Sequence, residues 1–331
     1  MIHLFKSVPT GGETEKIQEV LDSGWWAQGA KVKEFEEKFA EYVHAKYAVA
    51  TNSCSAALDL AVQVAPLGDE VTVTPLTFVS SALAILHAGK KVKFVDINPD
   101  TLCTDKADIQ VLYAGGNYGE GIIYDMAHFG GGYHKGLISC WSFHAVKNLP
   151  TGDGGMLTTN DEAIYKRLKA LSWCGIDKST YERSQGRYSW DYDIKEVGQK
   201  ANMNDITAAI GLEQLAWLPE RNAYRAKLAI WYDRYLSDKV IRPPHSTTWH
   251  MYVIQVPNRD ALYDKLAEEK ISAGVHYKPL YKYPIFPQTV MPNTERIWQN
   301  LITLPMHVDL DEDDVREVCE IVNKHVDNSS N

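Results

Sequence analysis

Cysteine is scarce in this sequence, and the patterns typical of metal-binding, secreted or membrane proteins are missing. The five cysteines among 331 residues are scattered and never form a CxxC motif, at Cys54, Cys103, Cys140, Cys174 and Cys319. An odd, dispersed set argues against a disulfide framework and against a zinc site. The sequence also lacks an apolar signal-peptide core and any run of about 18 apolar residues. We therefore expect no metal, no membrane span and a cytoplasmic location.

An excess of positive charge is also lacking. Lys and Arg total 34 against 43 Asp and Glu, so the net charge is −9. This balance argues against nucleic acid as the main partner. Repeats and low-complexity segments are absent too, and 45% hydrophobic content is ordinary for a globular protein. A chain of this length is expected to form one large domain and a smaller one.

Alternating helical and strand patterns in the first two-thirds predict an α/β domain with a mixed, mostly parallel central sheet flanked by helices. Strands are predicted at residues 47–50, 70–74, 91–96, 121–124, 137–143 and 156–159, and helices at 32–42, 56–64, 78–87 and from about 204. Later patterns predict strands at residues 251–256 and 273–277 and helices at 259–270 and 311–326. We expect a large domain over residues 1–225 and a small C-terminal α+β domain over 226–331.

A strand-to-helix turn at residues 53–58, S-C-S-A-A-L, carries small polar residues where a helix begins. The unpaired N–H groups and the dipole of a helix N-terminus favour an anion such as a phosphate. The alternative is an ordinary N-cap by Ser53, with no ligand.

Two further strand ends carry ionisable residues. Asp125 follows an apolar strand, with His128 three residues later. A carboxylate at the C-terminal edge of the sheet suits a cationic ligand such as a protonated pyridine nitrogen. Alternatively, Asp125 caps a turn and His128 is a core residue.

Lys147 follows the strand at residues 137–143, and a desolvated Lys there can form a Schiff base. Alternatively, Lys147 is a solvated surface charge.

Taken together and in order, these segments resemble the DegT/DnrJ/EryC1/StrS family of sugar aminotransferases. The resemblance rests on residues 53–58, 75–84, 125–128, 142–148 and 198–211, and extends from residues 23–29 to 302–306. The stretches S-F-H-A-V-K-N at 142–148 and G-Q-K-A-N-M-N-D at 198–205 are most similar to UDP-4-amino-4-deoxyarabinose synthase and related 4-keto-sugar aminotransferases.

The resemblance implies fold type I of pyridoxal-phosphate (PLP) dependent transferases, as in aspartate aminotransferase. By position, Lys147 matches the residue that forms the Schiff base with PLP and moves the catalytic proton. Asp125 matches the partner of the pyridine nitrogen, and His128 the contact to the O3′ oxygen. Phe78 matches an aromatic residue that stacks on the pyridine ring.

The same resemblance implies further contacts. The PLP phosphate is expected to contact Cys54, Ser55, Ser142 and Asn202, the last from the neighbouring subunit of a homodimer with shared active sites. The alternative for Asn202 is a helix N-cap. The sugar-nucleotide pocket is expected to include Trp25, Gln28, His276 and Tyr277.

The implied reaction is a ping-pong transfer from L-glutamate, through pyridoxamine phosphate, to a keto-sugar nucleotide, most simply a 4-keto-6-deoxyhexose for amino-sugar or surface-polysaccharide synthesis. One alternative is a 3-keto-sugar aminotransferase. Another is a sugar dehydratase of the same fold, although those relatives carry His in place of Lys147. A third, of another class, is a catalytically idle binding or regulatory protein.

Three departures from the family pattern stand out. The phosphate turn reads S-C-S rather than the usual S-G-T. The Cβ of Cys54 restricts the backbone if that position needs a positive φ, and we expect an exposed, reactive thiol there. Asp153 replaces the usual Glu. Only 19 residues separate Asp105 from Asp125, whereas the relatives that this sequence resembles carry roughly one strand–helix unit more between these points. We therefore expect the loss of one crossover helix, with residues 108–118 forming a short strand and loop.

Overall fold

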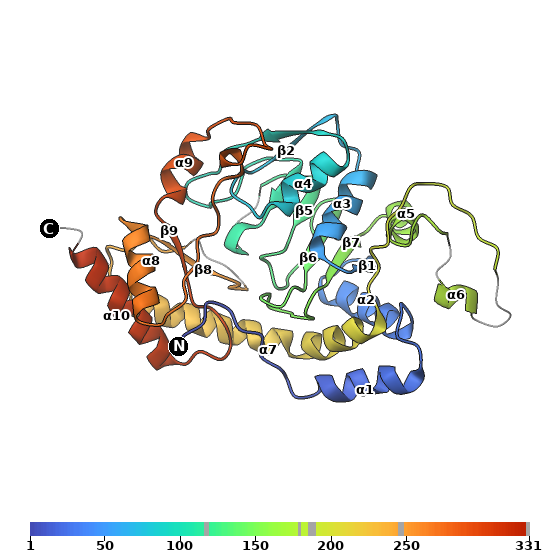
Figure 1. Ribbon diagram of the computed structural model, residues 1–331, viewed down its shortest axis with the longest axis horizontal. Coiled ribbons are helices and arrows are strands. Elements are labelled where there is room, and N and C mark those ends of the chain that lie inside the picture. Colours follow the sequence, from blue (N-terminus) through green and yellow to red (C-terminus); the bar gives the residue numbers. More distant parts are fainter. Residues whose placement is uncertain (116–118, 178–179, 185–189, 244–247, 329–331) are drawn as a thin grey trace.

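A seven-stranded mixed sheet forms the centre of the molecule (Figure 1). The computed structural model describes residues 1–115, 119–177, 180–184, 190–243 and 248–328. The strands are β1 (Tyr47–Thr51), β2 (Glu70–Val73), β3 (Lys91–Phe94), β4 (Ile109–Val111), β5 (Ile123–Asp125), β6 (Ile138–Ser142) and β7 (Gly155–Thr159). Their order is β1-β7-β6-β5-β4-β2-β3, and only β7 runs antiparallel to its neighbours. The predicted mixed, mostly parallel sheet is thus confirmed.

Helices pack on both faces of this sheet. The helices in this part of the chain are α1 (Glu13–Ser23), α2 (Ala30–Tyr42), α3 (Cys54–Val64), α4 (Ser80–His87), α5 (Glu162–Ser172), α6 (Thr180–Ser184) and α7 (Asp205–Tyr235). Apolar residues of α3, α4 and α5 share one core with the strands, whereas α2 and α7 share a second core on the opposite face. Period-2 alternation along the strands therefore sends side chains into two separate cores.

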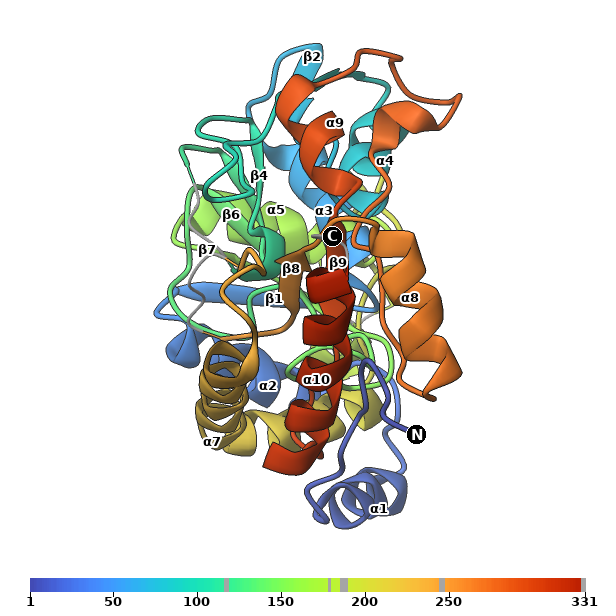
Figure 2. The same ribbon diagram turned by 90° about the vertical axis from the view of Figure 1, so that its left-hand side faces the viewer.

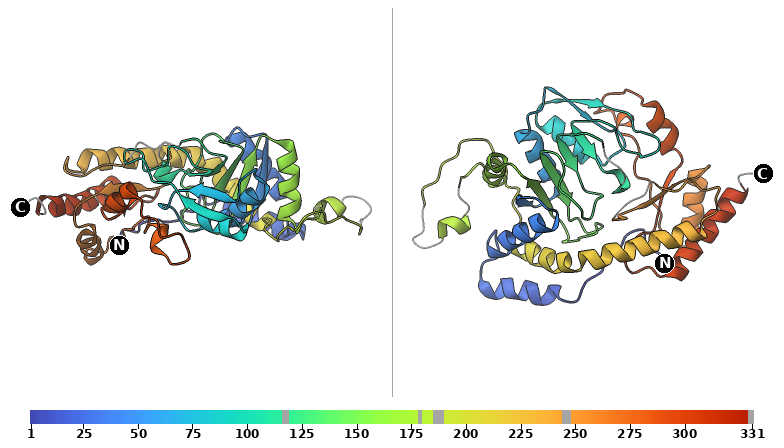
Figure 3. Two further views of the ribbon diagram at one scale, coloured as in Figure 1. Left: turned by 90° about the horizontal axis from the view of Figure 1, so that it is seen from above. Right: turned by 180° about the vertical axis from the view of Figure 1, so that it is seen from behind.

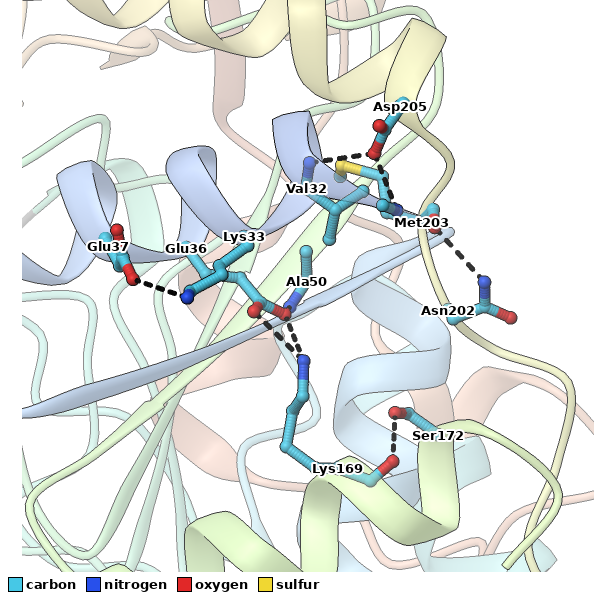
Figure 4. A network of polar contacts seen from close by, with 11 residues as sticks. Val32, Lys33, Glu36, Glu37, Ala50, Lys169, Ser172, Asn202, Met203 and Asp205 are labelled. Carbon is cyan, nitrogen blue, oxygen red and sulfur yellow. Dashed lines mark hydrogen bonds and ion pairs between the residues drawn. The ribbon is translucent and has the colours of Figure 1, made fainter. Parts of the chain in front are cut away.

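An ion pair with a buried carboxylate covers the free edge of the sheet at β1. Glu36 on α2 is 6% exposed, and its Oε1 accepts a hydrogen bond from the Ala50 N–H at 2.9 Å (Figure 4). Lys169 on α5 lies 3.0 Å from Glu36 Oε2. The pair satisfies a strand N–H that has no neighbouring strand to bond with.

The C-terminal part packs on the far end of α7 (Figure 2). It contains β8 (Tyr252–Gln255), α8 (Arg259–Glu268), α9 (Pro292–Trp298), β9 (Leu301–Leu304) and α10 (Glu312–Asn328), together with the short 3₁₀ turn at Leu280–Lys282. Strands β8 and β9 pair antiparallel. The boundary predicted at residues 225 and 226 falls inside α7, which is continuous there, and it stays a prediction.

The strand predicted at residues 273–277 is wrong. That segment makes one bridge, between Gly274 and Thr303, and then leaves the edge of β9. The His276 ring turns back to place Nδ1 2.8 Å from Thr303 Oγ1. A side-chain hydrogen bond thus takes the place of the next pair in the ladder.

The connection from β4 to β5 is short, as expected. After β4 the chain makes a 3₁₀ turn at Tyr113–Gly115, and no α-helix lies between the two strands in the described residues. The sheet face exposed by this loss carries polar side chains. Gln110 Nε2 donates to the Glu120 carbonyl at 2.9 Å, and Tyr124 Oη donates to the Gly119 carbonyl at 2.9 Å. On this face of the sheet, polar side chains that hydrogen-bond to a loop thus replace the apolar side chains that would pack against a helix.

Candidate active site

One cavity of about 330 Å³ opens at the carboxyl ends of β4, β5 and β6, the edge where α/β sheets hold ligands. The N-terminal turn of α3 and the segments around Phe78 and His276 form its other walls. The cavity brings together nine of the predicted site residues: Cys54, Ser55, Phe78, Asp125, His128, Ser142, Lys147, His276 and Tyr277. Its size is in the range of small-ligand and cofactor sites.

The α3 turn presents free donors to this cavity. Ser53 is the N-cap, and its Oγ accepts from the Ala56 N–H at 3.2 Å. The N–H groups of Cys54 and Ser55, in the first turn, have no carbonyl four residues earlier to bond with inside the helix. The N-cap interpretation of Ser53 is therefore confirmed, and it leaves two donors for an anion.

Cys54 begins α3 without backbone strain. It is not among the residues with positive φ, so its Cβ is accommodated. The residue is buried, and burial raises the pKa of its thiol well above the usual value, with the Asp125 charge adding to the effect. The expectation of an exposed, reactive thiol is wrong, because a protonated thiol is a poor nucleophile. The glycine that this turn requires is Gly155 on β7. A Cβ there would lie 2.5 Å from Cys54 N, so only glycine lets β7 approach the turn this closely.

Asp125 is a buried carboxylate at the end of β5. It is 5% exposed and accepts hydrogen bonds from Ser81 Oγ at 2.7 Å and from the Ala127 N–H at 3.0 Å. The second bond confirms that it caps a turn. Burial raises its pKa, whereas these hydrogen bonds lower it. The partners found for Asp125 among the described residues are these two neutral groups and no cation within 4.0 Å, so the cavity offers its carboxylate to a cationic ligand.

Lys147 lies in the loop between β6 and β7 and is partly buried at the cavity wall. Desolvation lowers the pKa of its ammonium to about 8, against the opposing charge of Asp125. The interpretation of Lys147 as a solvated surface charge is therefore wrong. An amine with this pKa is available as a base or nucleophile near neutral pH.

His128 packs between cavity-wall aromatics. Its Nε2 lies 2.9 Å from Tyr277 Oη, and its Nδ1 is buried with no hydrogen-bond partner among the residues that the structure describes. Burial, with the Lys147 charge second, lowers its pKa well below the ordinary value, so the ring is neutral. Phe78, 56% exposed, stands at the cavity mouth with its ring 6.2 Å from that of Tyr277.

His250 lies behind the cavity wall, in contact with Lys147, and the sequence did not single it out. It lies just before β8 and is 2% exposed, and its Nε2 is 3.2 Å from Lys147 Nζ. No local motif marks it, since 103 residues separate the two. The only signal was a histidine next to an apolar strand, which by itself suggests a core residue.

Trp25, Gln28 and Asn202 lie outside the cavity walls of this chain. Trp25 Nε1 donates to the Gln28 carbonyl at 3.0 Å, and Asp205 Oδ1 accepts from the Gly29 N–H at 2.8 Å, so this loop is bound to the start of α7. Asn202 donates from Nδ2 to the Met203 carbonyl at 3.1 Å (Figure 4). The N-cap of α7 is Asn204, so the N-cap alternative for Asn202 is wrong.

Known proteins share both this sequence and this fold. The profile of the DegT/DnrJ/EryC1/StrS aminotransferase family matches residues 10–115 and 116–323. The chain belongs to this family. The break in the match, between residues 115 and 116, falls in the shortened connection between β4 and β5.

Individual relatives agree with the family assignment. The spore coat polysaccharide biosynthesis protein SpsC of Bacillus subtilis is 33% identical over 94% of this chain and 93% of its own. The sugar aminotransferase CalS13 of Micromonospora echinospora superposes with a TM-score of 0.87 at 26% identity, covering 98% of this chain and 100% of its own. Spr1654 of Streptococcus pneumoniae, in its PMP form, gives 0.87 at 27% identity over 98% and 99%, and in its PLP form 0.86.

This DegT/DnrJ/EryC1/StrS chain therefore has fold type I of PLP-dependent transferases. Within the described residues, no helix is long and apolar enough to span a membrane. In the same part of the chain, no three His, Cys, Asp or Glu side chains are placed to hold a metal ion.

Proposed function

We propose that the protein is a PLP-dependent aminotransferase that moves an amino group from L-glutamate to a keto-sugar nucleotide. The observation that carries the proposal is the placement of Asp125, Lys147 and the α3 N-terminus around one cavity. An unpaired buried carboxylate, an amine with a pKa of about 8 and two free N–H donors match a pyridinium, an aldehyde and a phosphate. This donor set fits pyridoxal phosphate.

Each residue then has a defined task. The Cys54 and Ser55 N–H groups, with the Ser55 and Ser142 hydroxyls, would bind the phosphate. Asp125 would hold the pyridine nitrogen protonated, with Ser81 Oγ and the Ala127 N–H fixing its carboxylate. Phe78 would cover one face of the ring, and His128 would lie beside the O3′ oxygen. The bound cofactor supplies an electron sink for charge at the substrate carbon.

Lys147 Nζ would attach the cofactor and move the proton. It is the only Lys or Arg side chain lining the cavity in the described part of the chain. Its lowered pKa leaves a useful fraction of free amine near neutral pH, and its ammonium form can return the proton. Its presence also favours an aminotransferase over the dehydratase alternative.

The acceptor is proposed from the relatives. CalS13 is a sugar aminotransferase, and SpsC acts in polysaccharide biosynthesis by name. The sequence of residues 142–148 and 198–205 favours a 4-keto-6-deoxyhexose linked to a nucleoside diphosphate over a 3-keto sugar. His276 and Tyr277, both on the cavity wall, are placed to contact it.

We further propose a homodimer that completes each site. Trp25, Gln28 and Asn202 lie outside the cavity of their own chain, as expected if they serve the neighbouring subunit. The segment around α6 extends away from the body of the molecule (Figure 3). It exposes Trp190 at 78% and Val197 at 88%, apolar surface that a partner would cover.

The test is spectroscopic. Purified protein incubated with PLP should show a visible absorption band that L-glutamate removes, and Lys147→Ala should abolish both the covalent attachment and the response to glutamate. Lys33→Ala is the matched control, because Lys33 is an exposed lysine on α2. Wild-type protein that binds no PLP would sink the proposal. A panel of 4-keto and 3-keto sugar nucleotides then separates the two acceptors.

A further inference from the structure

His250 makes the direct side-chain contact to Lys147 Nζ, from a distant part of the chain. Its Nε2 lies 3.2 Å from Nζ. The neighbouring residues are joined as well, because Asn148 Nδ2 donates to the Thr248 carbonyl at 2.7 Å. Two hydrogen bonds therefore connect the lysine loop to the segment that leads into β8.

The His250 ring is held in one orientation. One face stacks on Phe5, with centroids 5.2 Å apart and planes 8° apart. The His128 ring lies against it at 5.3 Å. The backbone beside it is fixed by Arg225, whose Nη1 donates to the Met306 carbonyl at 2.8 Å and to the Trp249 carbonyl at 3.4 Å. The ring cannot swing away without breaking this packing.

The hydrogen bond has a defined direction. Burial lowers the pKa of His250 well below its usual value, and the neighbouring positive charges, Lys147 first, lower it further. A neutral ring accepts at one nitrogen and donates at the other. Since Lys147 can only donate when charged, Nε2 is the acceptor and the proton is on Nδ1, which is buried with no partner in the described residues.

We infer that His250 is the positioning residue for Lys147: its Nε2 holds the free Nζ in the cavity and stabilises the ammonium form. The inference rests on the proposed function, in which Lys147 must be free of the cofactor while it carries a proton. Burial favours the neutral amine, whereas the Asp125 charge favours the ammonium. An acceptor 3.2 Å away, at Nε2, also favours the ammonium, because it accepts a hydrogen bond from the charged form. Without Nε2 the balance shifts toward the neutral amine, and the proton is lost more easily.

The experiment measures Lys147 in cofactor-free protein. Trace labelling with acetic anhydride across pH, followed by peptide mass spectrometry, gives the midpoint at which Nζ becomes reactive. Wild type should titrate near 8. His250→Phe keeps an aromatic ring against Phe5 but removes the acceptor, so the midpoint should fall by about one unit, a tenfold change in the amine-to-ammonium ratio. His250→Gln returns an acceptor and should restore it.

The control is His307→Phe. His307 is another buried histidine, 3% exposed, whose Nε2 bonds to the His3 carbonyl and not to Lys147. An unchanged or raised midpoint in His250→Phe overturns the inference, as does an equal fall in His250→Gln. If His250→Phe does not fold, His250→Leu serves in its place. Because no cofactor is present, this result is independent of the PLP and glutamate test.

Discussion

At the scale of single residues, the site places two ionisable groups where burial disfavours both charges. Burial raises the pKa of Asp125 and lowers that of Lys147 to about 8. In the described residues Asp125 bonds to Ser81 and Ala127 and Lys147 contacts His250, and neither has an ion-pair partner within 4.0 Å. Such groups cost the empty protein stability, and a ligand that pairs with them recovers it.

Asp125→Asn should separate the stability cost of the buried carboxylate from its contribution to cofactor binding. The amide keeps the shape and can bond to Ser81 and the Ala127 N–H, but it carries no charge to pair with the pyridine nitrogen. The cofactor-free variant should unfold at a higher urea concentration than wild type. Its rate of glutamate half-transamination should be lower by about 100-fold or more, the scale of a broken buried charge pair. Equal rates in the two proteins would show that Asp125 does not pair with the cofactor.

Lys147→Met should stabilise the cofactor-free protein in a pH-dependent way. Burial lowers the Lys147 pKa from 10.5 to about 8, so below pH 8 the folded protein carries the full cost of a buried ammonium. Between pH 8 and 10.5 only the unfolded chain keeps this proton. The stability of wild type therefore rises with pH until the cost of burying the Lys147 ammonium has disappeared. Urea unfolding should show a gain of about 2–3 kcal/mol at pH 7 that declines toward pH 10. A gain independent of pH would contradict the shifted pKa.

The sequence predicts site residues well where the signal is local. The Ser53 turn, Asp125 and Lys147 each follow a strand, so the parallel order of β5 and β6 brings them to one edge. His250 was missed because its contact to Lys147 depends on how the C-terminal part packs. No spacing along the chain encodes that packing.

At the scale of elements, the shortened connection from β4 to β5 shows how the fold accommodates a lost helix. Loop residues pack directly on the sheet, and they do so through glycines. A Cβ on Gly119 would lie 1.8 Å from the Asp105 carbonyl oxygen, and one on Gly121 would lie 2.6 Å from Gln110 Cγ. The loop therefore approaches the sheet more closely than a helix with side chains could.

Gly119→Ala should accordingly destabilise the protein by about 2 kcal/mol or more, because the clash is with backbone that cannot move aside. The matched control is Gly68→Ala, where the added Cβ meets its nearest atom at an ordinary 3.7 Å and φ is not positive. The measurement is the urea midpoint of unfolding of wild type, Gly119→Ala and Gly68→Ala. Equal midpoints for Gly119→Ala and Gly68→Ala would show that the loop does not pack as described.

Helices with a clear start signal were predicted closely, whereas elements fixed by tertiary contacts were not. The prediction for residues 56–64 matches α3 apart from its first turn, because Ser53 caps it. Strand β9 and helix α9 were not anticipated. Conversely, residues 273–277 have the composition of a strand, yet the His276 bond to Thr303 ends the pairing after one bridge.

At the scale of the whole molecule, α7 connects the large sheet domain to the C-terminal part. It begins beside the loop of Trp25 and Gln28 and ends under β8 and α10 (Figures 1 and 2). The arm that includes α6 lies at the opposite end from α8 and α10 (Figure 1). The exposed apolar residues Trp190 and Val197 thus belong to the same continuous stretch of chain as Asn202, which pairs with Thr51 at the end of β1.

Trp190→Asp should therefore convert a dimer to a monomer and weaken PLP binding together. In the proposed homodimer the partner buries Trp190, so a charge there would cost association energy, and loss of the partner would remove its Asn202 from the phosphate site. Tyr263→Asp on α8 is the control, because this residue is 41% exposed at the other end of the molecule. Light scattering after size exclusion gives the mass, and titration with PLP gives the affinity. If Trp190→Asp stays dimeric with wild-type affinity, the arm does not form the interface. If it becomes monomeric with unchanged affinity, the partner contributes nothing to the cofactor site.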